Sequence, residues 1–252
     1  MKILGIIPAR YESTRFPAKA LVDIGGKSMV QRVYEQAFRA TSLQKVVVAT
    51  DHESIFDHVL SFGGQVCLTS KYHQSGTDRC QEVIDKEKEN FDYIINIQGD
   101  EPFIAPEQIN ILGACLDGVT QLATLVKKIN EQEQLFNPNV VKVIFNKNKE
   151  ALYFSRETIP HCRSFPKDQW LMKHSYYKHI GIYAYRTDIL SQITQLDVSG
   201  LEKTEALEQL RWLENGYKIK IAETTIETIG IDTPADLEKA IMMYLHDKNV
   251  NS

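Results

Sequence analysis

The sequence predicts an α/β fold with a mostly parallel, mixed sheet and flanking helices. Short apolar runs rich in branched residues alternate with longer stretches whose apolar residues recur at helical spacing. This order of strand, helix, strand, helix and strand is typical of a parallel sheet with right-handed crossovers. At 252 residues the chain can form one large domain, or one domain with a small inserted lobe.

The elements can be placed in order along the chain. The apolar runs predict strands at residues 2–8, 45–50, 65–69, 92–97, 121–129, 140–145, 176–185 and 217–222. Helical spacing predicts helices at residues 28–41, with Ser28 as a cap, and at 54–62, 80–89, 106–116, 204–215 and 235–245. Residues 161–175 have no period and are expected to form an exposed loop. We expect residues 1–120 and 121–252 to be two halves of a single domain.

The composition is that of a soluble globular protein, with 43% hydrophobic and 25% charged residues and a net charge of −4. Beyond the first loop no stretch is strongly basic, so nucleic acid is not an expected partner. No apolar run approaches the roughly 20 residues that span a bilayer, and no signal peptide is evident, so we expect no membrane insertion. The four cysteines form no CxxC pair and are expected to be reduced thiols of a cytoplasmic protein.

Three cations follow the first expected strand. Arg10, Arg15 and Lys19 occur within ten residues, with the hydroxyls of Ser13 and Thr14 between them. Cations crowded together repel one another unless an anion shares the space. In open α/β sheets, ligands bind at the carboxyl ends of the strands. The loop is therefore a candidate anion site, with a solvated basic loop as the alternative.

Two further polar segments follow expected strands. Asp100 stands after the strand at 92–97, and Gly99 allows a close backbone approach there; a carboxylate so placed suits Mg²⁺, which binds oxygen and keeps several waters. The alternative is an aspartate in a turn before Pro102. The segment 75–79 (SGTDR) precedes an expected helix, and its small residues can present N–H groups to an anion or a base edge. The alternative there is a simple helix cap.

Between Ile7 and about Leu245, six segments together resemble the 3-deoxy-manno-octulosonate (Kdo) cytidylyltransferases. These segments are PARYESTRFPAKAL, SGTDR, QGDEP, ALYFSR, KHIGIYAY and LEQLR. The resemblance implies a Rossmann-like fold of the nucleotide-diphospho-sugar transferase type, with nucleotide in the first half and sugar site and homodimer contact in the second. It also implies transfer of CMP from CTP to the anomeric hydroxyl of Kdo, for lipopolysaccharide assembly. One departure is Ala18-Lys19-Ala20, where the family usually has Gly-Lys-Pro; glycine would allow a positive φ that alanine resists.

The resemblance also implies roles for individual residues. It places catalytic groups at Arg10, Arg15, Lys19, Asp100 and Asp232, with Mg²⁺ on the two aspartates. The residues that it implies for the nucleotide are Pro8, Ala9, Arg10, Ser13, Lys19, Ser75, Gly76, Thr77, Arg79 and Gln98, of which Arg79 and Gln98 would read the cytosine edge. Those that it implies for the sugar are Arg156, His179, Tyr183, Glu208 and Gln209. Taken alone, Arg156 could be a surface cation, His179 a sheet residue and Asp232 part of a helix cap.

The chemistry agrees with these residue types. Attack at the α-phosphate needs in-line positioning and neutralisation of developing charge, which fixed cations and a metal supply. Two alternatives stay open: activation of another acid sugar, such as sialic acid or 8-amino-Kdo, and a CTP-binding sensor without catalysis. Intact Lys19, Asp100 and Asp232 weigh against the sensor. A dehydrogenase is disfavoured because no GxGxxG follows the first strand.

Overall fold

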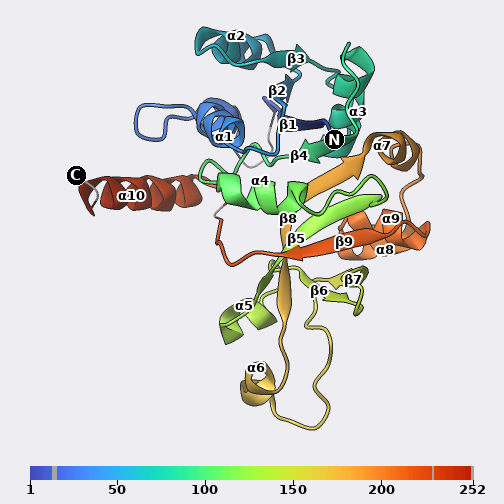
Figure 1. Cartoon of the computed structure of the whole chain (residues 1–252). Helices are drawn as coiled ribbons and strands as arrows, with labels where there is room; N and C mark the ends of the chain where they lie inside the picture. Colours follow the sequence, from blue (N-terminus) through green and yellow to red (C-terminus); the bar gives the residue numbers. More distant parts are fainter. Residues whose placement is uncertain (13–15, 229, 251–252) are drawn as a thin grey trace. The chain divides into compact units, whose positions relative to one another are not determined.

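The computed structural model describes residues 1–12, 16–228 and 230–250 (Figure 1). The chain forms two compact units, one made of residues 1–110 with those from Thr228 onward, and the other of residues 111–227. The chain passes from the first unit to the second within α4 (Pro106–Gly113). Among the described residues, no helix is long and apolar enough to cross a membrane.

The first unit contains a parallel sheet in the order β3-β2-β1-β4. Its strands are β1 (Ile3–Ala9), β2 (Lys45–Thr50), β3 (Val66–Leu68) and β4 (Tyr93–Asn96). The central strand β1 is buried almost throughout, which is typical of a parallel strand covered on both faces. Since all four strands run the same way, the segments that follow them meet at one edge of the sheet.

Side-chain caps mark the start of several helices in the first unit. These helices are η1 (Lys19–Leu21), α1 (Met29–Phe38), α2 (Glu53–Ser61), α3 (Gly76–Lys86) and α10 (Pro234–Val250). Ser28 caps α1 by accepting from the Gln31 amide, as predicted. Ser75 and Asp78 form a capping box that starts α3 four residues earlier than predicted.

The last helix returns to the first unit. Ala240 of α10 packs with Ile24, Met29 and Ile231 in one buried cluster. This packing places the first half of α10 next to Ile24 and Met29. It therefore brings Asp232, which follows Ile231, into the unit that contains Lys19.

The second unit contains a mixed sheet. Its strands are β5 (Leu122–Lys128), β6 (Lys142–Phe145), β7 (Ala151–Ser155), β8 (Tyr177–Arg186) and β9 (Ile219–Glu223). Strand β5 pairs in parallel with β9 and antiparallel with β8, and β6 pairs antiparallel with β7 and β8. Together the two units have the α/β fold and the mostly parallel, mixed strand pairing that the sequence predicts.

Two sequence predictions were wrong in the second unit. The helix expected at 204–215 is two helices, α8 (Gly200–Glu205) and α9 (Gln209–Glu214), because Ala206 takes a left-handed conformation with φ 51°. The loop expected at 161–175 contains η2 (Lys167–Gln169) and α6 (Trp170–Lys173).

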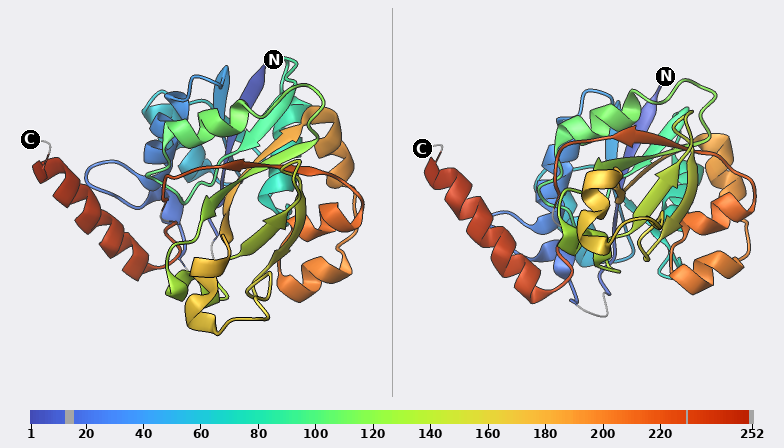
Figure 2. Two further views of the ribbon diagram at one scale, coloured as in Figure 1. Left: turned by 60° about the horizontal axis from the view of Figure 1, so that its bottom comes forward. Right: turned by 90° about the horizontal axis from the view of Figure 1, so that it is seen from below.

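The second error has a long-range cause. Trp170 is only 4% exposed and packs with Tyr176 and with Ile129 and Leu135, of which the last two lie far from it in the sequence. This cluster holds α6 against α5 (Gln132–Phe136), and the two helices lie side by side in both views of Figure 2. Neither α5 nor α7 (Thr187–Ile193) was predicted, because each is too short to show a period.

Candidate active site

A cleft of about 350 Å³ lies at the carboxyl edge of the first unit's sheet. Its lining is Pro8, Ala9, Arg10, Glu12, Lys19, Ala20, Gly76, Arg79, Gln98, Gly99, Asp100 and Asp232. Most of these were predicted from the sequence, and they come from four separate segments. Glu12 and Ala20 were missed as site residues; the signal for Glu12 was an acidic side chain in an otherwise cationic loop. Ser13 and Arg15 lie outside the described residues.

Gly99 allows the loop after β4 to approach β1. A Cβ atom at this position would lie 2.4 Å from the carbonyl oxygen of Pro8, a distance that no side chain can tolerate. The close approach expected from the sequence is therefore confirmed. Any other residue would push Asp100 and its loop away from the end of β1.

Lys19, Asp100 and Asp232 converge in the cleft. The Lys19 Nζ atom donates to Asp100 Oδ2 at 2.7 Å and to Asp232 Oδ1 at 3.2 Å. It also donates to the Ile231 carbonyl at 3.3 Å, while the Ile231 amide donates to the Asp100 carbonyl at 2.9 Å. One ammonium group thus joins two carboxylates that are distant in the sequence.

The side chain of Asp232 is not needed to cap α10. Asp236 accepts from the amides of Asp232 and Thr233 at 3.2 and 2.9 Å, and the Thr233 hydroxyl accepts from the Asp236 amide at 3.2 Å. Thr233 and Asp236 therefore cap the helix between them. The carboxylate of Asp232 instead pairs with Lys19.

Ala18 keeps the backbone path that the family's glycine would allow. It has φ 55° and ψ 21°, in the left-handed region. Its amide donates to the Tyr11 carbonyl at 2.9 Å, and its carbonyl accepts from the Leu21 amide at 2.9 Å. The left-handed conformation costs an alanine roughly 1–2 kcal/mol, which these turn contacts offset in part.

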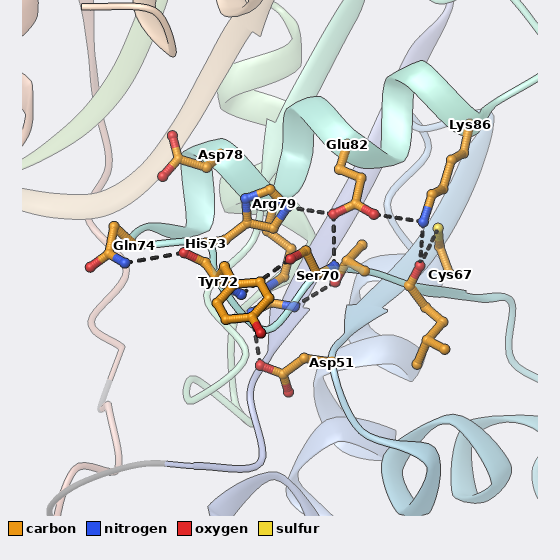
Figure 3. Close-up of polar contacts among 12 residues, drawn as sticks. Asp51, Cys67, Ser70, Tyr72, His73, Gln74, Asp78, Arg79, Glu82 and Lys86 are labelled. Atoms are coloured by element: carbon orange, nitrogen blue, oxygen red, sulfur yellow. Dashed lines mark hydrogen bonds and ion pairs between the residues drawn. The ribbon is translucent and has the colours of Figure 1, made fainter. Parts of the chain in front are cut away.

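The start of α3 is held by buried polar contacts (Figure 3). Arg79 is fully buried, and its guanidinium donates to Asp51 Oδ2 at 2.9 Å and to the Thr69 hydroxyl. Gly76 lines the cleft, whereas the Ser75 side chain caps the helix and Thr77 is 2% exposed. Of the predicted segment 75–79, Gly76 and Arg79 are thus the residues that reach the cleft.

Glu82 orders the segment that leads into α3. Its carboxylate accepts from the Ser70 amide at 2.8 Å, contacts His73, and pairs with Lys86 at 2.6 Å (Figure 3). Burial would raise the pKa of Glu82, but the hydrogen bonds from Lys86, Ser70 and His73 outweigh it and lower the pKa to about 2. The carboxylate therefore stays ionised over the physiological range.

The acidic loop after β4 holds a second carboxyl group with a shifted pKa. Burial raises the pKa of Glu101 to about 7, and the charge of Asp100 adds to this shift. A hydrogen bond with Thr228 acts in the opposite direction. The loop therefore carries less negative charge near neutral pH than its sequence suggests.

The residues predicted for the sugar lie in the second unit. His179 and Tyr183 are on β8, Glu208 directly precedes α9, and Gln209 is its first residue. The His179 Nε2 atom lies 3.0 Å from the Thr124 hydroxyl. The rings of His179 and Tyr183 are 5.2 Å apart.

Three buried polar atoms near these residues lack a hydrogen-bond partner of normal geometry among the described residues: Tyr183 Oη, Gln209 Nε2 and Trp212 Nε1. The Trp212 ring meets that of Tyr183 edge-on, at 5.1 Å. Buried polar groups are normally hydrogen-bonded, so a cluster of buried, unsatisfied polar atoms is typical of a ligand site. Trp212 was missed by the sequence analysis because its place on an apolar helix face predicts only a core residue.

Arg156 contacts the segment between α8 and α9. Its guanidinium donates to the carbonyls of Glu205, Pro138 and Ala206 at 2.7, 3.2 and 3.3 Å. The backbone amide of Arg156 also donates to the Glu205 carboxylate at 2.9 Å. The side chain is therefore engaged with carbonyl oxygens at the end of α8, two residues before Glu208.

Burial makes His179 neutral in the folded protein. It lowers the pKa of this imidazole to about 3, against an ordinary value near 6.5. Below pH 6.5 the unfolded chain binds a proton that the folded chain excludes, so the free energy of unfolding falls by about 1.4 kcal/mol per pH unit. We expect wild type to lose about 2 kcal/mol more than His179→Gln between pH 7 and pH 5, as measured by urea unfolding.

The control for this prediction is His174→Gln, since His174 is exposed in the same unit. This variant should lose stability with falling pH as wild type does. An equal loss in His179→Gln and wild type would show that His179 is not the group responsible.

A parallel α/β unit whose carboxyl edge presents a cation and two carboxylates defines a nucleotide-binding protein of the Rossmann-like class that lacks the dinucleotide glycine motif. Comparison with known proteins narrows this class. The family model described as cytidylyltransferase matches residues 4–221. A 3-deoxy-manno-octulosonate cytidylyltransferase of Parabacteroides distasonis is 58% identical over 246 residues, covering 96% of this chain and 97% of that protein.

A solved structure agrees over the whole chain. CMP:2-keto-3-deoxy-manno-octonic acid synthetase complexed with CTP has a TM-score of 0.90 and 42% identity, covering 98% of this chain and all of that one. The chain belongs to the 3-deoxy-manno-octulosonate cytidylyltransferase family, which confirms the resemblance drawn from its motifs. A 4-diphosphocytidyl-2C-methyl-D-erythritol synthase of Anaerococcus prevotii, at 12% identity and a TM-score of 0.63, shares the fold alone.

Proposed function

We propose that the chain transfers CMP from CTP to the anomeric hydroxyl of Kdo, giving CMP-Kdo and pyrophosphate for lipopolysaccharide assembly. The observation that carries this proposal is the convergence of Lys19, Asp100 and Asp232 in the cleft, in a chain that is 58% identical to a Kdo cytidylyltransferase. A sensor that only bound CTP would not need this catalytic set.

We propose Mg²⁺ as the cofactor, held by Asp100 and Asp232. Both carboxylates contact the Lys19 nitrogen, so both face the same part of the cleft and could hold a cation there. No group of three or more His, Cys, Asp or Glu side chains in the described residues could hold a metal. Two protein carboxylates, completed by phosphate oxygens and water, nevertheless suit Mg²⁺. When bound, the ion would neutralise charge that develops on the phosphoryl and leaving oxygens.

The chain's own residues orient the triphosphate. Arg10 and Lys19 line the cleft and supply positive charge along its wall. The Lys19 ammonium donates to both aspartates, which keeps its charge at the wall of the cleft where a triphosphate would bind. Arg15 and Ser13 belong to the same loop, and their roles stay predictions from the resemblance.

We expect CTP to be strongly preferred over ATP and GTP. The base would lie among Pro8, Ala9, Gly76, Arg79 and Gln98, which share one cleft. A site that pairs with one base edge rejects bases that leave its buried groups unpaired, by on the order of 100-fold or more in kcat/KM. Pyrophosphate release with each nucleotide at saturating Kdo measures this, with UTP as a weaker substrate. Equal turnover with ATP would contradict it.

We propose that Arg156, His179, Tyr183, Glu208 and Gln209 bind the sugar acid. The orphaned polar atoms of Tyr183 and Gln209 support this, because sugar hydroxyls would satisfy them. Burial keeps His179 neutral and raises the pKa of Tyr183, so both side chains can donate hydrogen bonds at neutral pH.

The assay that tests the proposed function is pyrophosphate release with CTP, Mg²⁺ and a panel of acid sugars. Kdo should give the highest kcat/KM, ahead of 8-amino-Kdo and sialic acid. Higher activity with either of the other sugars would change the assigned substrate. No release with any of them would favour the CTP-binding sensor.

We also propose a cytoplasmic homodimer. The four cysteines are free, which agrees with a reducing compartment. In the second unit Leu152, Phe165 and Met172 are 57%, 40% and 74% exposed, which supports contact with a second copy. Light scattering should give twice the 28.8 kDa mass of the chain, and a monomer would contradict the proposal.

A further inference from the structure

Asp51 connects two segments that form the nucleotide cleft. It follows β2, and its two carboxylate oxygens have different partners in the first unit. Oδ1 accepts from the backbone amide of Tyr11 at 3.3 Å. Oδ2 accepts from Arg79 at 2.9 Å (Figure 3). Tyr11 directly follows Arg10 in the first loop, and Arg79 is in the first turns of α3. Asp51 itself does not line the cleft.

The pair formed by Asp51 and Arg79 is almost completely removed from solvent, with side-chain exposures of 11% and 0%. A buried guanidinium is costly unless a carboxylate and further acceptors satisfy it. Arg79 also donates to the Thr69 hydroxyl, which in turn donates to the Thr50 carbonyl at 3.0 Å. Arg79 therefore fixes α3 to the ends of β2 and β3, and Asp51 is its charged partner in the described residues.

A second contact holds the same point of the first loop. The ring of His52 stacks on that of Tyr11, with centroids 3.8 Å apart and planes 14° apart. Two consecutive residues after β2 thus hold Tyr11, one by its amide and the other by its ring. The Tyr11 carbonyl accepts from the Ala18 amide at 2.9 Å, and Ala18 forms the turn that presents Lys19.

We propose that Asp51 is a positioning residue for the transfer. Through Tyr11 it sets the placement of Arg10 and Lys19, and through Arg79 it sets the start of α3, so it determines the shape of the nucleotide cleft without contacting the nucleotide. This inference rests on the proposed function, because CTP is its probe. The alternative is an ion pair that contributes only to stability.

The test variant is Asp51→Asn, which keeps the size of the side chain and an acceptor for Tyr11 but removes the charge that faces Arg79. We expect KM for CTP to rise about 10-fold or more, the effect of losing a charged hydrogen bond, with KM for Kdo within about 2-fold of wild type. Calorimetry with CTP alone should show the same loss of affinity. A drop in Tm with unchanged KM for CTP, or an equal rise in both KM values, would overturn the proposal.

The matched control is Glu87→Gln. Glu87 pairs with Lys45 at 2.7 Å, with exposures of 14% and 20%, in the same unit but away from the residues of the cleft. Its loss should affect Tm and leave KM for CTP unchanged. If Glu87→Gln raises KM for CTP as much as Asp51→Asn does, the effect is one of general stability and the proposal fails.

A second variant covers the case in which Asp51→Asn does not fold. His52→Asn removes the ring stacked on Tyr11 but leaves an acceptor for the Ser54 amide, which His52 caps at the start of α2. We expect KM for CTP to rise about 3-fold, with KM for Kdo unchanged. No change in KM for CTP would overturn the proposal. Wild-type protein that binds CTP but releases no pyrophosphate would contradict the proposed function, and calorimetry on the variants would still decide the role of Asp51.

Discussion

Asp100→Asn and Asp232→Asn should each lower turnover by about 100-fold or more while the protein stays folded. Each change removes a charged oxygen that we propose as a Mg²⁺ ligand, and a loss of about 3 kcal/mol in transition-state stabilisation corresponds to this factor. The side chains are 29% and 46% exposed, so an amide of the same size should leave the core intact. Pyrophosphate release at saturating CTP and Kdo, measured over a range of Mg²⁺ concentrations, gives the comparison.

The control for these variants is Asp85→Asn. Asp85 is exposed on α3, away from the residues that line the cleft, and accepts a local hydrogen bond from Gln81 at 2.7 Å, so its variant should turn over like wild type. Near-normal turnover of Asp232→Asn at limiting Mg²⁺ would remove Asp232 from the metal site. In that case its pairing with Lys19 would have a structural role only.

Arg156→Ala should weaken the sugar selectively. We expect kcat/KM for Kdo to fall about 10- to 150-fold, the cost of a lost charged hydrogen bond, with little change in KM for CTP. A guanidinium matches the carboxylate of Kdo in a bidentate geometry. The variant should also weaken Kdo binding indirectly. Arg156 donates to the carbonyls of Glu205 and Ala206 just before Glu208, so its loss would disturb the position of Glu208. Both KM values should be measured with the partner substrate saturating.

Two further variants sharpen this test. Arg156→Lys keeps the charge but not the planar fork, so it should recover only part of the loss. Arg163→Ala removes an exposed arginine of the same unit and should leave both KM values unchanged. If CTP binding falls and Kdo binding does not, Arg156 belongs to the phosphate site and the assignment of nucleotide and sugar to different halves is misplaced.

Elements whose signals are local could be predicted from the sequence. The strand at 45–50 has the predicted bounds, and Ser28 caps α1, because apolar runs and capping depend on neighbouring residues. Elements that depend on distant contacts could not. The helix expected at 204–215 is interrupted at the left-handed Ala206, where Arg156, about fifty residues earlier, donates to the carbonyls of Glu205 and Ala206. Trp170 lies in a helix within the expected loop, and the distant residues Ile129 and Leu135 help to bury it.

The sequence by itself determined the family, the α/β class and the types of residue that line the cleft. Short motifs can be recognised from consecutive residues, without knowing how distant segments pack. Only the tertiary structure decided that Lys19 joins Asp100 to Asp232, since three segments must fold together before their charges meet. The tertiary structure also showed that Arg79 pairs with Asp51. In the sequence, Asp51 is recognisable only as the residue after a strand. Charged groups interact over a few ångströms in space, and sequence separation carries no information about that distance.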